Sequence, residues 1–283
     1  MRIRVMSVVL PGAVALSALC LPATAQAAER PGAAVRLGSF AARGVHPDTS
    51  LGNISFSKAV INGGKDIVLG TTTKKSVTVT YTATSSSGVA LTEAFLWQGT
   101  DSSSTDTITG ALGTDDDPAC TESTTRTGVY ACTAVFHINA ASDLKNNGVA
   151  GTWKLFLGGY DLYANASYDD DVATTRIKKA SRLTANAAPE PVKKGRSITV
   201  TGSLKRADWN DGTYAGYAGQ GVLLQYRKKG SNTYTTLKKV TSGNGGSLKT
   251  TTTATADGYY RFSFATNATT AASTATGDYV DVR

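Results

Sequence analysis

Two runs of three consecutive aspartates, Asp115-Asp116-Asp117 and Asp169-Asp170-Asp171, are the residues in this sequence whose type and spacing could bind a metal ion. Carboxylate oxygens are the hard ligands that Ca²⁺ prefers. Adjacent carboxylates repel one another, so such runs either stay solvated in turns or recruit a cation. Neither run has the Asp-x-Asp-x-Asp-Gly spacing of an EF-hand loop. Both interpretations stay open, and no cofactor other than calcium is expected.

A second candidate site lies at residues 206–221, where aromatic, acidic and turn-forming residues gather without a strand or helix period. We expect a long loop carried by the strands on either side, an arrangement that holds many binding sites. Its candidate functional residues are Trp209, Asp211, Tyr214 and Tyr217. Aromatic rings in such a loop either bind a ligand or pack against a neighbouring domain.

The sequence lacks the residue patterns of common hydrolases. Of its two histidines, His46 lies in a segment without periodicity, and His137 follows Phe136 on a predicted strand, on the face opposite to Phe136. No Gly-x-Ser-x-Gly or His-Glu-x-x-His pattern is present. No pair of carboxylates is singled out for glycoside hydrolysis. We therefore expect a protein that is not an enzyme.

The N-terminus reads as a secretory signal peptide. Two arginines precede an apolar segment at residues 5–21, and Ala25-Gln26-Ala27 supplies a small-x-small cleavage sequence. The alternatives are an uncleaved anchor and a lipid anchor on Cys20. Cleavage after residue 27 predicts a secreted or extracellular protein, without a membrane span, that begins at Ala28.

Removing the signal peptide leaves two cysteines, Cys120 and Cys132. An even count in an exported chain predicts a disulfide. The residues between them are typical of a hairpin with its turn near residues 126–128.

Alternating apolar and polar residues predict an all-β protein of two domains, at residues 51–182 and 183–283, after a flexible segment at residues 28–50. Helix is expected only as one turn near residues 140–147. The predicted strands are 54–56, 67–69, 76–81, 89–97, 105–112, 128–138, 152–157 and 172–178, and then 183–187, 197–204, 222–227, 233–240, 248–254, 259–264 and 279–282.

In the second domain, alternation assigns one face of each strand to the core. The inward positions are Ile198, Val200, Val222, Leu224, Tyr226, Tyr260, Phe262, Phe264, Val280 and Val282. Thr199, Arg227, Arg261 and Asp281 are predicted to face water. The linker between the domains should arrive beside residues 206–221, so we favour packing over ligand binding for the aromatic residues of that loop.

Charge is unevenly distributed. Residues 28–182 contain 14 basic and 15 acidic side chains, whereas residues 183–283 contain 13 basic and 6 acidic ones. Solvated strand edges that discourage aggregation explain such a surplus. Attraction to an anionic surface, such as an acidic wall polymer, is the alternative.

Several segments resemble immunoglobulin-like modules of secreted actinobacterial proteins. They are Val192-Lys193-Lys194-Gly195 with Ile198-Thr199-Val200-Thr201-Gly202, Gly221-Val222-Leu223-Leu224-Gln225-Tyr226-Arg227, Asp257-Gly258-Tyr259-Tyr260-Arg261-Phe262, and Gly151-Thr152-Trp153-Lys154-Leu155. The resemblance implies two tandem immunoglobulin-like or fibronectin-like antiparallel β-sandwiches. It transfers no catalytic residue.

Three functions follow as hypotheses. The leading one is a non-enzymatic exported protein that acts in binding, in adhesion or in association with the cell wall. Its expected partners are an anionic cell-wall polymer, a polysaccharide or another extracellular protein, and not nucleic acid. The alternatives are an inhibitor of an extracellular hydrolase and a carbohydrate-active enzyme.

Overall fold

The computed structural model describes residues 33, 36 and 53–283, and these form an all-β structure of two sandwiches. The predicted signal peptide at residues 1–27 lies outside the described residues, as does the predicted flexible segment at residues 28–50 apart from Ala33 and Arg36. Among the described residues, no helix is long and apolar enough to cross a membrane.

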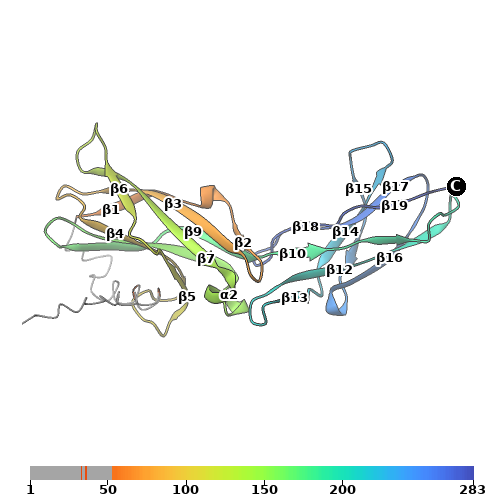
Figure 1. Ribbon diagram of the computed structural model, residues 1–283, viewed down its shortest axis with the longest axis horizontal. Coiled ribbons are helices and arrows are strands. Elements are labelled where there is room, and N and C mark those ends of the chain that lie inside the picture. Colours follow the sequence, from red (N-terminus) through yellow and green to blue (C-terminus); the bar gives the residue numbers. More distant parts are fainter. Residues whose placement is uncertain (1–32, 34–35, 37–52) are drawn as a thin grey trace, which may run out of the picture. The chain divides into compact units, whose positions relative to one another are not determined.

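The first sandwich has a sheet of four strands and a sheet of five (Figure 1). Neighbouring strands are antiparallel except for β2 and β9, which pair in parallel. In sheet order the strands are β1 (Ser55–Ile61), β3 (Lys74–Thr84), β7 (Val129–Asn139) and β6 (Ala119–Glu122), and then β2 (Ile67–Leu69), β9 (Ala166–Lys179), β8 (Gly151–Tyr160), β4 (Leu91–Gly99) and β5 (Ile108–Gly113). The first sheet has the A-B-E-D order of an immunoglobulin domain, and the second contains its G-F-C order.

The core of the first sandwich follows strand alternation in one sheet and departs from it in the other. Along β3, the side chains of Val77, Val79, Tyr81 and Ala83 are buried and those between them are not. On β4, four consecutive residues from Ala94 to Trp97 are buried, because the second sheet is covered on both faces.

Residues of the N-terminal region cover part of the outer face of the five-stranded sheet in the first sandwich. Ala33 packs against the cluster of Phe95, Trp97 and Phe156. The Arg36 guanidinium lies 5.1 Å from the centre of the Phe95 ring and donates a hydrogen bond to the carbonyl of Thr114 at 3.2 Å. Both described residues of this segment are helical, and both contact the aromatic cluster.

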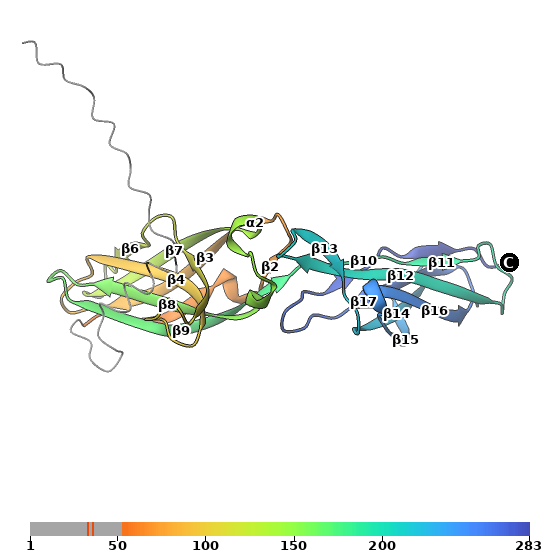
Figure 2. The ribbon, with the colours of Figure 1, turned by 90° about the horizontal axis from the view of Figure 1, so that it is seen from below.

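The second sandwich has two five-stranded sheets (Figure 2). In the first sheet, β12 (Ser197–Asp208) pairs with all the other strands, which are β10 (Ser181–Leu183), β11 (Asn186–Ala188), β13 (Thr213–Gly216) and β16 (Ser247–Thr253). The second sheet contains β15 (Thr235–Thr241), β14 (Gly221–Lys228), β17 (Gly258–Phe264), β18 (Ser273–Thr274) and β19 (Asp278–Val280). The A-B-E and C-F-G orders of an immunoglobulin-like sandwich are present again.

The predicted all-β class is therefore confirmed, and within residues 53–283 helix is confined to short turns. These are α2 (Ala140–Asp143), η1 (Asn62–Gly64), η2 (Asn147–Val149) and η3 (Asn244–Gly246). The inward positions predicted for the second sandwich are buried, except that Tyr226 and Val282 are half-buried at its margin.

Two predicted elements differ from the structure. The strand expected at 183–187 is instead divided into β10 and β11, which pair with different parts of β12. The loop expected at 206–221 is largely a hairpin, because β12 continues to Asp208 and β13 pairs back onto it. The turn of this hairpin contains Asp208 and Gly212, both residue types that favour turns. Asp208 Oδ1 accepts the N–H of Asn210 at 3.1 Å and that of Asp211 at 3.4 Å, and Gly212 has a positive φ of 65°.

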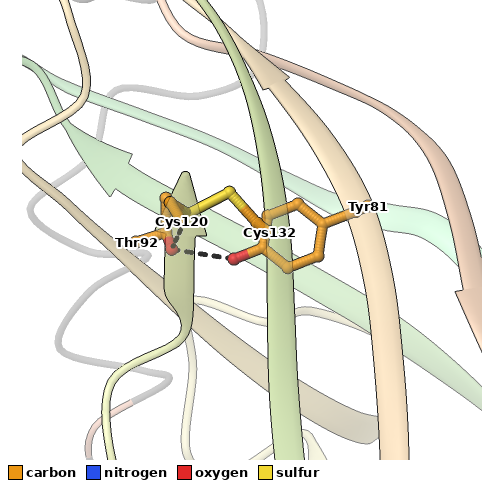
Figure 3. The surroundings of a disulfide bond; sticks show 4 residues. All are labelled: Tyr81, Thr92, Cys120 and Cys132. Carbon is orange, nitrogen blue, oxygen red and sulfur yellow. Dashed lines mark hydrogen bonds between the residues drawn. A yellow bond between two sulfur atoms is a disulfide. The ribbon is translucent and has the colours of Figure 1, made fainter. Parts of the chain in front are cut away.

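The predicted disulfide is confirmed, and it lies within one sheet (Figure 3). Cys120 on β6 and Cys132 on β7 are directly opposite one another in the antiparallel ladder. Beside the bond, the Tyr81 hydroxyl on β3 and the Thr92 hydroxyl on β4 are 2.8 Å apart, and Thr92 Oγ1 is 3.4 Å from Cys120 Sγ. Burial raises the pKa of Tyr81 to about 12, although the hydrogen bond with Thr92 opposes this shift. The Tyr81–Thr92 pair thus links the two sheets where the disulfide secures the edge strand β6.

Replacing Cys120 and Cys132 together by serine should lower the free energy of unfolding by about 2–3 kcal/mol, because the bond restricts the unfolded chain across a sequence separation of 12 residues. Urea unfolding of the double variant and the wild type measures the difference. An unchanged midpoint would show that the hairpin contributes its stability without the bond.

Candidate functional site

The aromatic residues of the β12–β13 hairpin occupy different environments. Trp209, at the start of the turn, is only 5% exposed and belongs to the same buried cluster as the core of the first sandwich. Its indole Nε1 donates a hydrogen bond to the carbonyl of Gly70 at 2.9 Å. Trp209 is therefore unavailable to a ligand from solvent, and it joins the second sandwich to the first.

A polar cluster surrounds the Trp209 backbone. Asn147 Oδ1 accepts the N–H of Trp209 at 2.9 Å and a hydrogen bond from Lys179 Nζ. Asn147 Nδ2 donates to Asp208 Oδ1 at 2.6 Å, and the Asn147 N–H donates to Asn210 Oδ1 at 2.7 Å. The hydrogen bond from Asn147 lowers the pKa of Asp208, and the backbone N–H groups of the turn act in the same direction.

Two consecutive lysines at the end of β9 are buried in this region. Lys179 Nζ lies 5.4 Å from the centre of the Trp209 ring. Burial, followed by the nearby Arg206 guanidinium, lowers the pKa of Lys179 to about 8, with Asp208 opposing the shift. Lys178 Nζ lies 2.6 Å from Asp66 Oδ2 and donates to Thr266 Oγ1 at 2.8 Å. Each lysine thus contacts residues of both sandwiches.

The other predicted residues of the hairpin are distributed differently. Tyr214 packs at the margin of the first core, with the Arg182 guanidinium 3.6 Å from its ring centre. Tyr217 packs edge-on against Phe264 in the second core, with ring centres 5.9 Å apart. Asp211 is exposed in the turn. The structure brings Trp209 and Tyr214 together around Gly70 and leaves Tyr217 and Asp211 apart from them.

The two acidic runs do not converge on a metal site. Asp115, Asp116 and Asp117 are exposed in a turn. The run 169–171 lies on β9 beside an irregularity in its pairing with β8, with Asp169 and Asp171 exposed and Asp170 half-buried. Asp170 accepts a hydrogen bond from Ser102, and Asp171 lies 3.7 Å from Lys154 Nζ. In the part of the chain that the structure describes, no group of three His, Cys, Asp or Glu side chains is placed to hold a metal ion. The geometry therefore does not support calcium binding by either run.

His137 is exposed on β7, on the face opposite to the buried Phe136, as the alternation predicts. Its Nδ1 atom lies 3.3 Å from Asp115 Oδ2, and both side chains are more than half exposed. Such a surface contact contributes little to stability.

A half-buried aromatic and cationic cluster lies on the second sandwich, on the outer face of the sheet that contains β14 and β17. The ladder places Arg227 opposite Tyr259, and Tyr259 opposite Tyr279. The segment that precedes β15 brings Tyr234 to the same face, 5.3 Å from the Arg227 guanidinium. We call this surface the Arg–Tyr stack, and its members are Arg261, Tyr234, Arg227, Tyr259, Tyr279 and Lys229.

The contacts within the Arg–Tyr stack join cations to tyrosine rings and one ring to another. The Arg261 guanidinium lies 3.5 Å from the centre of the Tyr234 ring, and the Arg227 guanidinium lies 4.1 Å from that of Tyr259. The Tyr259 and Tyr279 rings are 5.2 Å apart, and Lys229 Nζ is 5.3 Å from the Tyr279 ring. Hydrogen bonding to Tyr234 raises the pKa of Arg227, and hydrogen bonding to Tyr279 raises that of Lys229, so both side chains stay protonated.

Sequence reasoning placed Arg227 and Arg261 on the outer face but missed the stack. The available signal was the parity of Tyr259 and Tyr279, which alternate with the buried Tyr260 and Val280. The position of Tyr234 carried no such signal, because this residue precedes β15 and is brought over the sheet by a loop.

Comparison with known proteins adds no functional assignment. A scan against protein-family models finds no match, and a search of curated proteins finds none. Solved structures that are similar include the fibronectin(III)-like modules of Clostridium thermocellum CbhA, at 12% identity, a TM-score of 0.31 and coverage of 79% of this chain and 94% of that one. The adhesin InvE of Yersinia pseudotuberculosis is 14% identical with a TM-score of 0.28, covering 82% and 61%. The D00-D0 domain of intimin is 16% identical with a TM-score of 0.26, covering 78% and 98%.

At identities and TM-scores this low, these similarities carry no argument about function. Strand order and register define the chain as a protein of two immunoglobulin-like β-sandwiches. What it binds has to be inferred from its own surface.

Replacing Trp209 by alanine should lower the free energy of unfolding by about 3–5 kcal/mol, because a buried indole is lost from a core that both sandwiches share. Urea unfolding measures the loss. Tyr163→Ala removes a ring that is 77% exposed and is the control, with an expected change within about 0.5 kcal/mol. A loss below about 1 kcal/mol for Trp209→Ala would contradict the packing role.

Lys179→Met should change how stability depends on pH. The pKa of Lys179 falls from its usual 10.5 to about 8 on folding, so between these values the unfolded chain binds the extra proton. The free energy of unfolding of the wild type, relative to the methionine variant, should therefore rise as the pH increases from 8 to 10.5. Denaturant unfolding across this range measures the difference, with the exposed Lys205→Met as control. A difference independent of pH would refute the effect.

Proposed function

We propose that this protein is a non-enzymatic exported binding protein that attaches to an extracellular anionic polymer through its second sandwich. The observation that supports the proposal is the uncompensated charge of residues 183–283, which carry 13 basic and 6 acidic side chains. An excess of this kind attracts anionic partners over the distance at which salt screens charge, about 10 Å at 0.1 M ionic strength.

Most of this charge is not neutralised by local ion pairs. Lys229 lies 3.5 Å from Asp257, and Arg283 lies 2.9 Å from Asp281. Among the described residues, no other basic side chain of this sandwich has a carboxylate at salt-bridge distance. A surface that holds this many free cations is suited to a ligand that carries many anions, because several weak contacts then act together.

Export and the non-enzymatic role rest on other observations. The disulfide is typical of an oxidising compartment, which agrees with the predicted signal peptide. The exposed His137 and the separated carboxylates present no nucleophile and base in contact. Binding, including adhesion or attachment to a cell wall, is the function that these features favour.

Binding of the full mature chain to carboxymethyl-dextran beads tests the proposal, with uncharged dextran beads as the control. The protein should bind the anionic beads at about 50 mM NaCl and be released as salt approaches about 500 mM, because screening weakens contacts between exposed charges. Equal retention on both bead types, or no retention on either, would refute the proposal. Fractionating cells that produce the protein shows whether it stays with the wall or enters the medium.

A further inference from the structure

Hydrogen bonds and ring contacts hold the two arginines of the Arg–Tyr stack in fixed positions. Arg227 donates a hydrogen bond to the carbonyl of Ser231, and Arg261 Nε donates to Gln225 Oε1 at 2.9 Å. Each guanidinium is also held against a tyrosine ring. An arginine fixed on one edge keeps further N–H donors for a ligand, and it loses less conformational entropy when the ligand binds.

The Tyr234 ring of the Arg–Tyr stack is held in place by neighbouring segments. Its hydroxyl occupies the space beside Gly277, where a Cβ atom would come within 3.3 Å of two atoms of the ring's phenol group. The segment from Lys229 to Thr233 carries Tyr234 over the sheet, and the bond from Arg227 to Ser231 secures this segment. Glycine at position 277 thus makes room for the ring that both arginines contact.

The positive charge of the Arg–Tyr stack is balanced by a carboxylate at one end only. At one end, Asp257 pairs with Lys229 and accepts hydrogen bonds from the Tyr279 hydroxyl at 3.1 Å and the Val282 N–H at 2.9 Å. At the other end, Arg227 and Arg261 have no salt-bridge partner among the described carboxylates. The two arginines are therefore the part of the stack that is available to an anion.

The spacing of these arginines favours anions carried on one chain. Both guanidinium groups lie within 5.3 Å of the centre of the Tyr234 ring. Anions that bind both at once must be close neighbours, as in a polymer with a charge on each repeating unit. Guanidinium groups bind planar carboxylates through two parallel hydrogen bonds.

The residues around the Arg–Tyr stack favour a polysaccharide over a nucleic acid. Neutral hydroxyl and amide groups continue the same face, since Thr236 lies opposite Gln225 and Ser263 lies opposite Thr274. These groups suit a ligand that presents hydroxyls between its charges. The tyrosine rings are themselves engaged by guanidinium groups and by one another, which leaves little ring surface on which nucleic-acid bases could stack.

We infer that the Arg–Tyr stack is a binding site for an acidic polysaccharide that carries carboxylates on successive sugars. Arg227 and Arg261 bind neighbouring carboxylates, Tyr234 and Tyr259 hold the two guanidinium groups in place, and Gln225 and Thr236 lie where sugar hydroxyls would contact the sheet. This inference rests on the proposed function and adds to it the site and the class of ligand.

Sodium polygalacturonate is the probe, and its affinity for the full mature chain is measured by calorimetry at low salt. Arg227→Ala/Arg261→Ala should weaken binding at least about tenfold. Lys193→Ala/Lys194→Ala is the matched control, because it removes the same charge from exposed residues outside the stack, and it should weaken binding by less than about threefold. Arg227→Lys/Arg261→Lys keeps the charge and removes the fork, so it should lose most of the affinity even if the alanine variant folds poorly.

Two further ligands test the class. Fully methyl-esterified polygalacturonate keeps the sugars without the charge, and long-chain polyphosphate keeps charge without sugars; each should bind at least about tenfold more weakly than polygalacturonate. Equal losses in the stack and control variants would overturn the site and leave the proposed function standing. Tighter binding of polyphosphate would overturn the ligand class. If the wild type bound neither polymer, the proposed function would fail with the inference.

Discussion

The indole N–H of Trp209 is buried, and its hydrogen bond to the carbonyl of Gly70 is the contact on which the junction of the two sandwiches depends. A buried donor without a partner costs free energy, so the backbone at Gly70 has to stay where the indole meets it. A Cβ atom on Gly70 would lie 2.8 Å from the Tyr214 hydroxyl, so the residue that accepts the bond also makes room for the second aromatic ring. Asn147 fixes the adjoining backbone from the first sandwich.

This junction assigns different roles to the aromatic residues of the second sandwich. Those near the first sandwich are used for packing, and the two buried lysines at the end of β9 contact both sandwiches. The rings on the outer face of β14, β17 and β19 are free of such constraints and order the arginines between them. We therefore propose binding at the sheet face, where two guanidinium groups lack partners among the described carboxylates, and not at the hairpin where the aromatic residues are densest in sequence.

Local patterns predicted much of the fold and less of the site. Alternation in Ser76-Val77-Thr78-Val79-Thr80-Tyr81 located β3, and the parity of Phe136 and His137 assigned their faces. The cysteine pair and its hairpin were also predictable, because few cysteines remained to pair. The β12–β13 hairpin was missed although Asp208 and Gly212 are turn residues, since β13 has only four residues and its sequence, Thr-Tyr-Ala-Gly, lacks a clear period of two. Three adjacent aspartates suggested a cation site, but Asp170 accepts a hydrogen bond from Ser102 and Asp171 lies near Lys154.

Local patterns are enough to establish that the chain is built of strands, which side chains of the second sandwich face its core, and that Cys120 can bond to Cys132, because a period of two and a short hairpin are local properties. The burial of Trp209 against Gly70, the enclosure of Lys178 and Lys179, and the contact of Tyr234 with both Arg227 and Arg261 come from long-range packing. These outcomes depend on which distant strands become neighbours, on their register, and on the path of a loop. Such long-range pairings are set by the packing of the whole sandwich and leave no periodic trace in the segments that take part.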